Sequence, residues 1–261
     1  MDLNRPAQHT ATSAFTLREL VVVIAVLSLL GGTLLAALHQ RAAWQIKKTQ
    51  CAANLRRFAL ATQLHATENG DQLPYTSSSG WPWNLPTASA NSLLTYGMDK
   101  RSFYCPGTAP RFNDHLNYLN SGNNSLWNYF TGLHITGYTI AFSPSSLILS
   151  NQNTTILPEP PKLNSVTYQP IPANHERVLL ADATISDNYL GTAANPTPAG
   201  SFTSVAGGFS VNGLNHPHLS PHLKGNLPDG GNLAFKDGHV AWREFKDMSQ
   251  RALGIGRGFW W

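Results

Sequence analysis

The feature that most constrains this chain is an uncharged run at residues 20–38, LVVVIAVLSLLGGTLLAAL. Only Ser28 and Thr33 in it are polar, so a helix built from it has no polar stripe to face water. At about 1.5 Å per residue, such a helix spans roughly the hydrocarbon core of a bilayer. A secretory signal peptide usually has a shorter apolar region, with basic residues before it. The run therefore predicts one membrane-spanning helix.

An acidic residue, Glu19, stands immediately before this run. A carboxylate that enters hydrocarbon costs on the order of 1–3 kcal/mol, depending on its depth, so it needs a partner. If the chain is cut between Ala14 and Phe15, Phe15 becomes the first residue and Glu19 the fifth. The new amine of Phe15 in one subunit can then neutralise Glu19 of a neighbour in a helical stack.

The segment AFTLRELVVVIAVLSLL, which begins at Ala14, resembles the prepilin cleavage and methylation motif of type IV pilins and type II secretion pseudopilins. The resemblance implies that a prepilin peptidase removes a leader at 1–14 and that Phe15 is N-methylated. It also implies a transmembrane and assembly helix at 15–38, through which the chain polymerises with other pilin-like subunits. Two positions depart from the family pattern: Ala14 replaces the usual Gly, and Ala36 stands where pilins often have Pro.

The basic residues around the run disagree with the orientation that the motif implies. Two precede the run and three follow it: Arg5 and Arg18, then Arg41, Lys47 and Lys48. The positive-inside rule alone favours the opposite topology, but a long translocated domain crosses largely regardless of charge. We therefore expect a single-pass inner-membrane protein whose head is in the periplasm or at the cell surface. The chain has a net charge of +4, and we interpret the basic residues after the run as a membrane-proximal helix face. No nucleic-acid partner is expected.

Residues 39–69 continue the helical pattern as a periplasmic stem, without Pro or Gly before Gly70. Apolar residues recur there at spacings of three, four and seven and predict one stripe packed on a sheet: Trp44, Cys51, Leu55, Phe58 and Ala61. We interpret the stripe as ordinary core, without a ligand. One helix over residues 17–67 would be about 75 Å long, half in lipid and half pinned to a head domain.

The head domain, residues 70–261, has a composition typical of an extracytoplasmic protein, since only 12% of the chain is charged. A loop region with short elements is expected from Pro74 to Leu133. Strands are predicted at 138–142, 154–157, 177–181, 201–205, 232–235 and 239–242. A helix followed by many short strands predicts an α+β fold, pilin-like, with a long N-terminal helix packed on an antiparallel β-sheet head with long loops.

Several head segments resemble a group of pseudopilin-like proteins from planctomycete and verrucomicrobial envelopes. The segments are CAANLR from Cys51, FYCP from Phe103, RVLLAD from Arg177 and GNLAFKDGHV from Gly231. That group is marked by a His, nine intervening residues and then Asp-Gly. Here Leu227 stands in the place of that His, and His222 is five residues earlier. The pair Asp237-Gly238 is predicted to form a hairpin turn between two strands.

The two cysteines, Cys51 and Cys105, are too few for a disulfide scaffold and lack the paired spacing of a zinc site. In an oxidising periplasm they are candidates for one disulfide, which would stabilise the head by about 4 kcal/mol on the chain-entropy model. Two buried free thiols are the alternative, and the sequence does not choose between them.

Candidate metal ligands are found among the histidines and acids of the head. Four histidines form the nearest approach to a cluster: His216, His218, His222 and His239. Neutral imidazole is a common ligand of Zn or Cu, although histidines in a Pro-interrupted loop are more often solvated. For calcium, which the pseudopilin resemblance raises, the candidates are Asp182 and Asp187, without a dense acidic loop around them. We therefore predict no bound cofactor, with calcium as the alternative.

No catalytic motif is found in the sequence: a nucleophile elbow, a Walker loop and a dinucleotide fingerprint are all missing. Nothing selects a pair of carboxylates for glycoside hydrolysis. We therefore predict a head that is not an enzyme. Trp81, Trp83 and Trp127 lie in polar loops, where they suit a carbohydrate platform but are more typical of core, and the C-terminal residues 259–261 are expected to dock on the head.

Two functions remain open at this point. The first is a pilin-like structural subunit of a type II secretion or type IV pilus-like system. The second is a membrane-anchored glycan-binding or surface-binding module that uses a prepilin-type signal without forming filaments.

Overall fold

The structure is a computed structural model that describes residues 16–76, 80–108, 127, 131–142, 145, 148, 177–187, 201–211, 214–254 and 257–261. At 206–211, 214–216 and 252–254 it describes the backbone alone. The chain divides into two compact units, one ending at Ala43 and the other beginning at Trp44. The predicted leader at 1–14, the cleavage site at Ala14 and Phe15, and the predicted strand at 154–157 lie outside the described residues.

The first element is helix α1, Leu17–Glu68, which agrees with the prediction to within one residue at its end. At its start, the Thr16 backbone N–H and hydroxyl each donate to Glu19 Oε2 at 2.8 Å, which satisfies one of the free N–H groups of the first turn. At its end, Gly70 takes a φ of 62°, and the Asp71 N–H bonds the Ala66 carbonyl at 2.8 Å.

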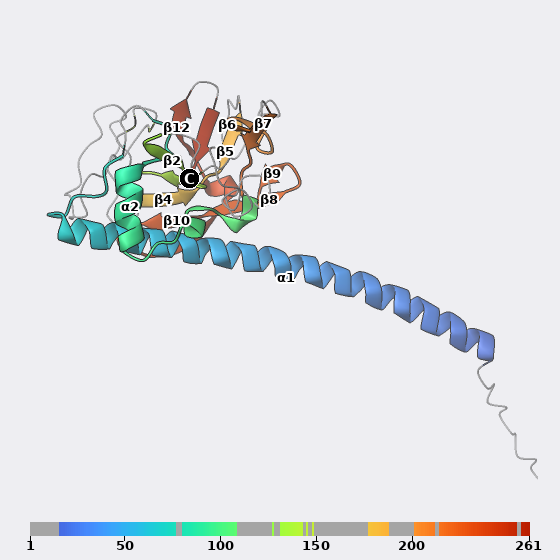
Figure 1. The fold of residues 1–261 in the computed structure, drawn as a ribbon. Coiled ribbons are helices and arrows are strands. Elements are labelled where there is room, and N and C mark those ends of the chain that lie inside the picture. The colour runs from blue at the N-terminus through green and yellow to red at the C-terminus, as the bar shows by residue number, and fades with distance from the viewer. Residues whose placement is uncertain are drawn as a thin grey trace, which may run out of the picture. The chain divides into compact units, whose positions relative to one another are not determined.

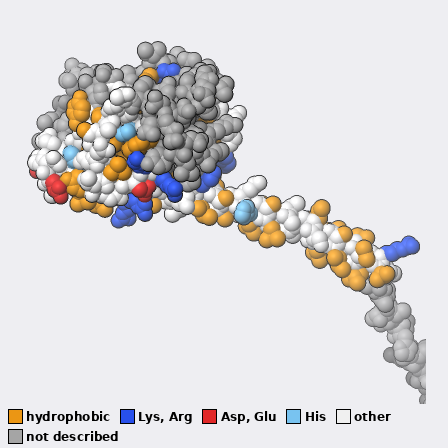
Figure 2. All heavy atoms as spheres, in the orientation of Figure 1, with side chains coloured by type: hydrophobic (Ala, Val, Ile, Leu, Met, Phe, Trp, Pro, Cys, Tyr) orange, Lys and Arg blue, Asp and Glu red, His pale blue; other side chains and the backbone are white. Residues whose placement is uncertain are grey.

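In the first unit, α1 exposes apolar side chains on every face. Even the least exposed large apolar residue between 17 and 38, Val23, is 42% exposed. Ser28 and Thr33 donate their hydroxyls to the carbonyls of Ile24 and Leu30, so the two polar side chains of the run are bonded within the helix. Figure 2 shows these apolar side chains along α1. By length and composition, this helix is able to cross a membrane once.

In the second unit, the continuation of α1 buries the predicted stripe. Cys51, Leu55, Phe58 and Ala61 are all 1% exposed or less, and Trp44 is half-buried. They join the main core, in which the Phe58 ring lies edge-on to Phe103 with centroids 5.1 Å apart. The prediction of a core-facing stripe is confirmed.

The main sheet is antiparallel and has the strand order β11-β10-β4-β3 (Figure 1). Its strands are β3 Tyr138–Ile140, β4 Val178–Asp182, β10 Gly230–Phe235 and β11 Val240–Glu244. β10 pairs with β11 and β4, and β4 pairs with β10 and β3, which makes β10 and β4 the two central strands. Four of the predicted strands are found here, each within two residues at either end. With α1, this arrangement gives the predicted α+β fold.

The hairpin between β10 and β11 turns at Asp237-Gly238, as predicted. Gly238 has a φ of 90°, which a side chain would strain, and its N–H donates to the Phe235 carbonyl at 2.9 Å. The Asp237 carboxylate accepts from the His239 N–H at 3.2 Å.

A second antiparallel sheet has the order β12-β13-β5. Its strands are β5 Ile185–Asp187, β12 Gln250–Gly254 and β13 Arg257–Trp260. The chain passes from β4 to β5 through Ala183 and Thr184, and the Thr184 carbonyl accepts from the Trp260 N–H at 2.9 Å. The residues Phe259, Trp260 and Trp261 are buried, which confirms the expected docking of 259–261.

The remaining elements are short. They are β1 Asn84–Pro86, α2 Thr87–Thr95, η1 Lys100–Phe103, η2 Pro106–Thr108, β2 Leu133–Ile135, β6 Val205–Val211, β7 Leu214–His218, β8 Leu223–Lys224, β9 Leu227–Pro228 and η4 Phe245–Asp247. The strand predicted at 201–205 is wrong for most of its length, since β6 begins at Val205. Ser201 Oγ instead accepts from the N–H groups of Thr203 and Ser204, which folds the segment into a turn.

The tryptophans of the polar loops belong to the core. Trp83 is 1% exposed and Trp127 is 3% exposed, and Trp81 stacks on Trp83 with ring centroids 5.2 Å apart. Trp83 and Trp127 are therefore core residues, and Trp81 is half-buried against that core.

Candidate functional site

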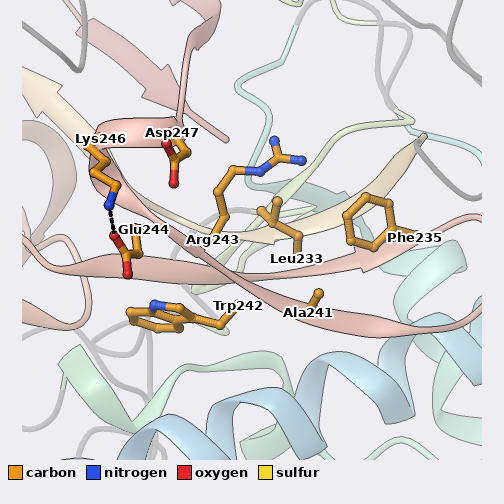
Figure 3. Close-up of a pocket in the computed structure, with 8 residues that line it drawn as sticks. All are labelled: Leu233, Phe235, Ala241, Trp242, Arg243, Glu244, Lys246 and Asp247. Atoms are coloured by element: carbon orange, nitrogen blue, oxygen red, sulfur yellow. Dashed lines mark ion pairs between the residues drawn. The ribbon is translucent and has the colours of Figure 1, made fainter.

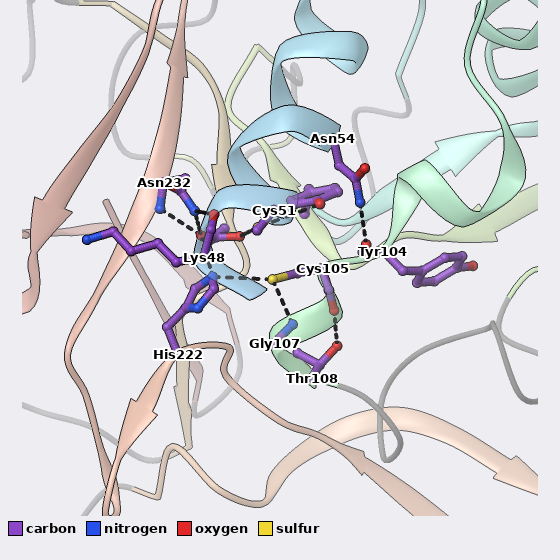
Figure 4. A network of polar contacts seen from close by, with 11 residues as sticks. Lys48, Cys51, Asn54, Tyr104, Cys105, Gly107, Thr108, His222 and Asn232 are labelled. Carbon is purple, nitrogen blue, oxygen red and sulfur yellow. Dashed lines mark hydrogen bonds and ion pairs between the residues drawn. The ribbon is translucent and has the colours of Figure 1, made fainter. Parts of the chain in front are cut away.

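Four residues from distant parts of the sequence converge in the interior of the second unit. Cys51 comes from α1, Cys105 from between η1 and η2, Asp182 from the end of β4, and His222 from the segment before β8. All four are buried, and one potential ligand atom from each lies within 4.8 Å of the others. Figure 4 shows Cys51, Cys105 and His222 turned toward one another.

The polar atoms of this cluster are in hydrogen-bond contact. The Cys51 thiol donates to Asp182 Oδ1 at 2.6 Å, and His222 Nε2 lies 3.3 Å from Asp182 Oδ2. Cys105 Sγ is 3.4 Å from the same His222 nitrogen. The cluster thus joins two thiols, one carboxylate and one imidazole in a single network.

A surrounding layer of hydrogen bonds fixes the orientation of these groups. The Asn232 backbone N–H donates to Asp182 Oδ2 at 2.6 Å, and its side-chain amide donates to the same oxygen at 3.2 Å and to the Lys48 carbonyl at 3.3 Å. The Gly107 N–H donates to Cys105 Sγ at 3.3 Å. Asp182 Oδ2 is therefore held by β10, while Oδ1 is left facing Cys51.

The backbone at the cluster is under local constraint. His222 has a φ of 55°, a left-handed conformation that costs a non-glycine residue about 1–2 kcal/mol. A Cβ on Gly107 would lie 3.2 Å from Cys105 Sγ and 3.2 Å from His222 Cε1, so only glycine fits there without a shift. Strain of this kind is concentrated at functional positions, where the surrounding structure maintains it.

Aromatic rings and one lysine enclose the His222 side of the cluster. The Trp242 ring lies edge-on to His222 with centroids 5.4 Å apart, and the Trp44 ring lies edge-on to it at 6.4 Å. Lys48 Nζ sits 3.6 Å from the centroid of the Trp242 ring. These contacts keep bulk water from the imidazole, so the cluster lies in a region of low dielectric.

Burial and mutual charge shift the pKa values of the cluster. Burial raises the pKa of Cys51 and raises that of Cys105 to about 11. Burial lowers the pKa of His222, but the Asp182 carboxylate outweighs it and raises this pKa to about 10. Burial raises the pKa of Asp182, and the charge and hydrogen bonds of His222 with those of Cys51 and Asn232 bring it below its ordinary value. Without a metal ion, the network at neutral pH is a buried Asp182–His222 ion pair beside two neutral thiols.

The structure brings together some of the predicted metal ligands and separates others. Asp182 and His222 meet in the cluster. Asp187 lies in β5, where its N–H bonds the Ser201 carbonyl. His218 is buried in a stack on Trp83 with centroids 5.4 Å apart. His239 is exposed and lies 2.6 Å from the Asp237 carboxylate. His216 lies in β7, in a stretch where only the backbone is described.

The two cysteines are free buried thiols in the structure, so the alternative to a disulfide is the one observed. The physical reason is their partners, because Cys51 Sγ is directed at Asp182 and Cys105 Sγ lies beside His222. The interpretation of the stem stripe as core is confirmed for Cys51, which belongs to the cluster as well.

Sequence reasoning missed the cluster because it judged the cysteines by their spacing to each other. The second resemblance carried a usable signal: the segments CAANLR, FYCP and RVLLAD contain Cys51, Cys105 and Asp182 respectively. Asn232, which orients Asp182, lies in the fourth segment.

An open pocket of about 490 Å³ lies elsewhere on the head, over β10, β11 and η4 (Figure 3). It is lined by Leu233, Phe235, Ala241, Trp242, Arg243, Glu244, Lys246 and Asp247. Lys246 Nζ lies 2.6 Å from Glu244 Oε2 at its edge, with 69% and 57% of the two side chains exposed. Such an exposed ion pair is ordinary surface chemistry and does not select a ligand.

Comparisons with known proteins give no match for this chain, whether against protein-family models, curated proteins or solved structures. The architecture itself, a long N-terminal apolar helix followed by a β-rich head, is compatible with a pilin-like protein.

Proposed function

We propose that this chain is a pilin-like structural subunit of a type II secretion or type IV pilus-like system. It is inserted in the inner membrane by the first part of α1, cleaved before Phe15 and N-methylated there, and it polymerises with other pilin-like subunits. The observation that carries the proposal is an apolar helix exposed on all sides with one carboxylate, Glu19, at its start.

The exposed apolar surface supports both membrane insertion and subunit packing. Water disfavours a helix whose apolar side chains are exposed all round, at roughly 25 cal/mol per Å² of apolar surface. Lipid or the same helix of neighbouring subunits removes that cost. The internal bonds of Ser28 and Thr33 leave neither hydroxyl in need of an outside partner.

Glu19 supports assembly over simple anchoring. Its carboxylate accepts from the Thr16 N–H and hydroxyl, which caps the first turn of α1, and a helix anchored only by its apolar run does not need an acid beside that run. In an assembled stack, the amine of Phe15 from a neighbouring subunit supplies a positive charge next to Glu19, as the resemblance to the prepilin motif implies.

The test replaces this carboxylate and compares two variants of the full chain. Glu19→Gln should remain in the membrane but fail to enter filaments, because its neutral amide attracts the amine of the next subunit only weakly. The matched control is Glu68→Gln at the other end of α1, which should assemble like the wild type.

Intact mass of the chain extracted from membranes checks the processing step. The expected result is loss of residues 1–14 and gain of one methyl group. A mature chain that begins elsewhere, or assembly of Glu19→Gln at the wild-type level, would contradict the proposal and favour an anchored binding module.

A further inference from the structure

The cluster of Cys51, Cys105, Asp182 and His222 has the composition of a structural metal site. Thiolate and imidazole are the ligands that zinc prefers in proteins, and a carboxylate oxygen is its third common ligand. We propose that these four residues bind one Zn²⁺ ion in a closed tetrahedral site that fastens α1 to the head. This inference does not depend on the proposed function.

The distances fit such a site. With bonds of about 2.3 Å to sulfur and about 2.0 Å to nitrogen or oxygen, neighbouring ligands of tetrahedral zinc lie roughly 3.3–3.8 Å apart. Cys105 Sγ and Asp182 Oδ2 lie 3.4 Å and 3.3 Å from His222 Nε2, and no pair of the four ligand atoms exceeds 4.8 Å. The contact between Cys51 Sγ and Asp182 Oδ1 is shorter, at 2.6 Å, and a bound ion would hold these two atoms about 3.5 Å apart.

One zinc ion replaces three protons at the site. Binding releases the thiol protons of Cys51 and Cys105 and the imidazolium proton of His222 to solvent, and Zn²⁺ then forms bonds to two thiolates, one neutral imidazole and the Asp182 carboxylate. The net charge of the four side chains and the ion therefore changes from zero to −1. That charge is met by the N–H groups already directed at it, from Gly107 to Cys105 Sγ and from Asn232 to Asp182 Oδ2.

The surrounding layer supports a ligand site over an incidental cluster. Zinc ligands in proteins are oriented by hydrogen bonds from a second layer of residues, and Asn232 and Gly107 have this role here. The left-handed backbone of His222 is a second, independent sign, since it turns a non-glycine residue into the cluster against its local preference.

The site connects four segments that are far apart in the sequence. Cys51 and Asp182 are separated by 131 positions, and Cys105 and His222 by 117. A bound ion would therefore join α1, the η1–η2 segment, β4 and the segment before β8 at one point. The expected role is structural, since all four positions of a tetrahedral ion are taken by protein ligands.

The experiment uses the full chain purified in detergent without reductant or chelator. Elemental analysis should find about one zinc per chain, and the chelated, unfolded protein should show two free thiols. Removal of zinc should lower the melting temperature of the head by about 10 °C or more, since binding to the folded state alone stabilises it. Metal-free protein with the same melting temperature as after zinc addition, or a Cys51–Cys105 disulfide in the purified chain, would overturn the proposal.

Variants locate the ion within the chain. Cys105→Ser and His222→Gln should each lose most of the zinc. Two histidine controls should keep it: His218→Gln, which is buried, and His239→Gln, which is exposed. Full zinc content in His222→Gln would be an overturning result.

Cobalt substitution in the wild-type protein tests the site if a ligand variant does not fold. Co²⁺ added to the zinc-free wild-type protein should give the intense visible absorption of a tetrahedral thiolate complex. Zinc should then displace it. A featureless visible spectrum would also overturn the site.

Discussion

Helix α1 contains two parts that share one secondary structure and differ in what their side chains meet. Between residues 17 and 38 all the large apolar side chains are exposed, whereas between 51 and 61 the apolar side chains of one stripe are buried against the sheet. The first part has no polar face, and the second has basic residues opposite its stripe. The comparison shows that helix formation is common to both parts and that the angular distribution of polar residues decides the environment of each.

The largest expected effect comes from shortening a buried leucine of the second part. Leu55→Ala should lower the free energy of unfolding of the head by about 2–5 kcal/mol, because Leu55 is 0% exposed and its loss leaves a cavity. Urea unfolding of the full chain in detergent, followed by tryptophan fluorescence, measures this change. Leu60→Ala is the matched control, since Leu60 is 53% exposed on the same part of α1. Equal losses in the two variants would break the comparison.

A charge in the first part should act on membrane retention and leave the head unchanged. Leu27→Arg places a guanidinium near the middle of the apolar run, where insertion becomes less favourable by about 2.5–3.5 kcal/mol. Membrane fractionation should show a shift of the chain out of the bilayer, while the urea midpoint of the head stays at the wild-type value. Retention equal to that of Leu27→Ile would argue against a spanning role for this part.

The smallest expected effect is the change in the free energy of unfolding for each pH unit. It tests whether the interior of the head excludes water. Burial lowers the pKa of His218 to about 3. The unfolded chain takes up this proton near pH 6.5 and the folded chain only near pH 3, so the unfolded state binds more protons between these values. Between pH 6.5 and pH 3, the contribution of His218 to the free energy of unfolding should therefore fall by about 1.4 kcal/mol for each pH unit of acidification.

The corresponding control is His218→Gln, which has no imidazole to protonate. Its free energy of unfolding should fall less steeply with acidification than that of the wild type over the same interval. Equal slopes would mean that His218 has solvent access in solution.

The sequence was sufficient wherever a local signal decided the structure. The long helix followed from its uninterrupted pattern, and the β10–β11 hairpin followed from Asp237-Gly238, whose glycine alone suits the positive φ of the turn. The burial of 259–261 followed from the size of its aromatic side chains. In contrast, Ser201 bonds the backbone two and three residues on, a turn preference that the strand prediction at 201–205 overlooked.

Local sequence signals could not predict the candidate site. Its four residues come from separate segments, so no spacing between them is fixed by a helix turn or a hairpin. His222 reaches the cluster through a left-handed backbone that no propensity predicts. Only three-dimensional pairing, in which Leu233 meets Ala181 and Asn232 therefore lies next to Asp182, brings the ligands within contact.

The contact between β10 and α1 has a consequence for the order in which the head folds. Asn232 bonds the carbonyl of Lys48 across 184 positions, so the stem stripe is among the first parts of the head to leave the ribosome and among the last to be covered. Until Phe103 and Tyr138 have been synthesised, the Phe58 ring lacks the aromatic partners that it has in the core, a state in which chains aggregate readily. Folding of this protein therefore includes an interval during which a chaperone has a defined apolar segment to bind.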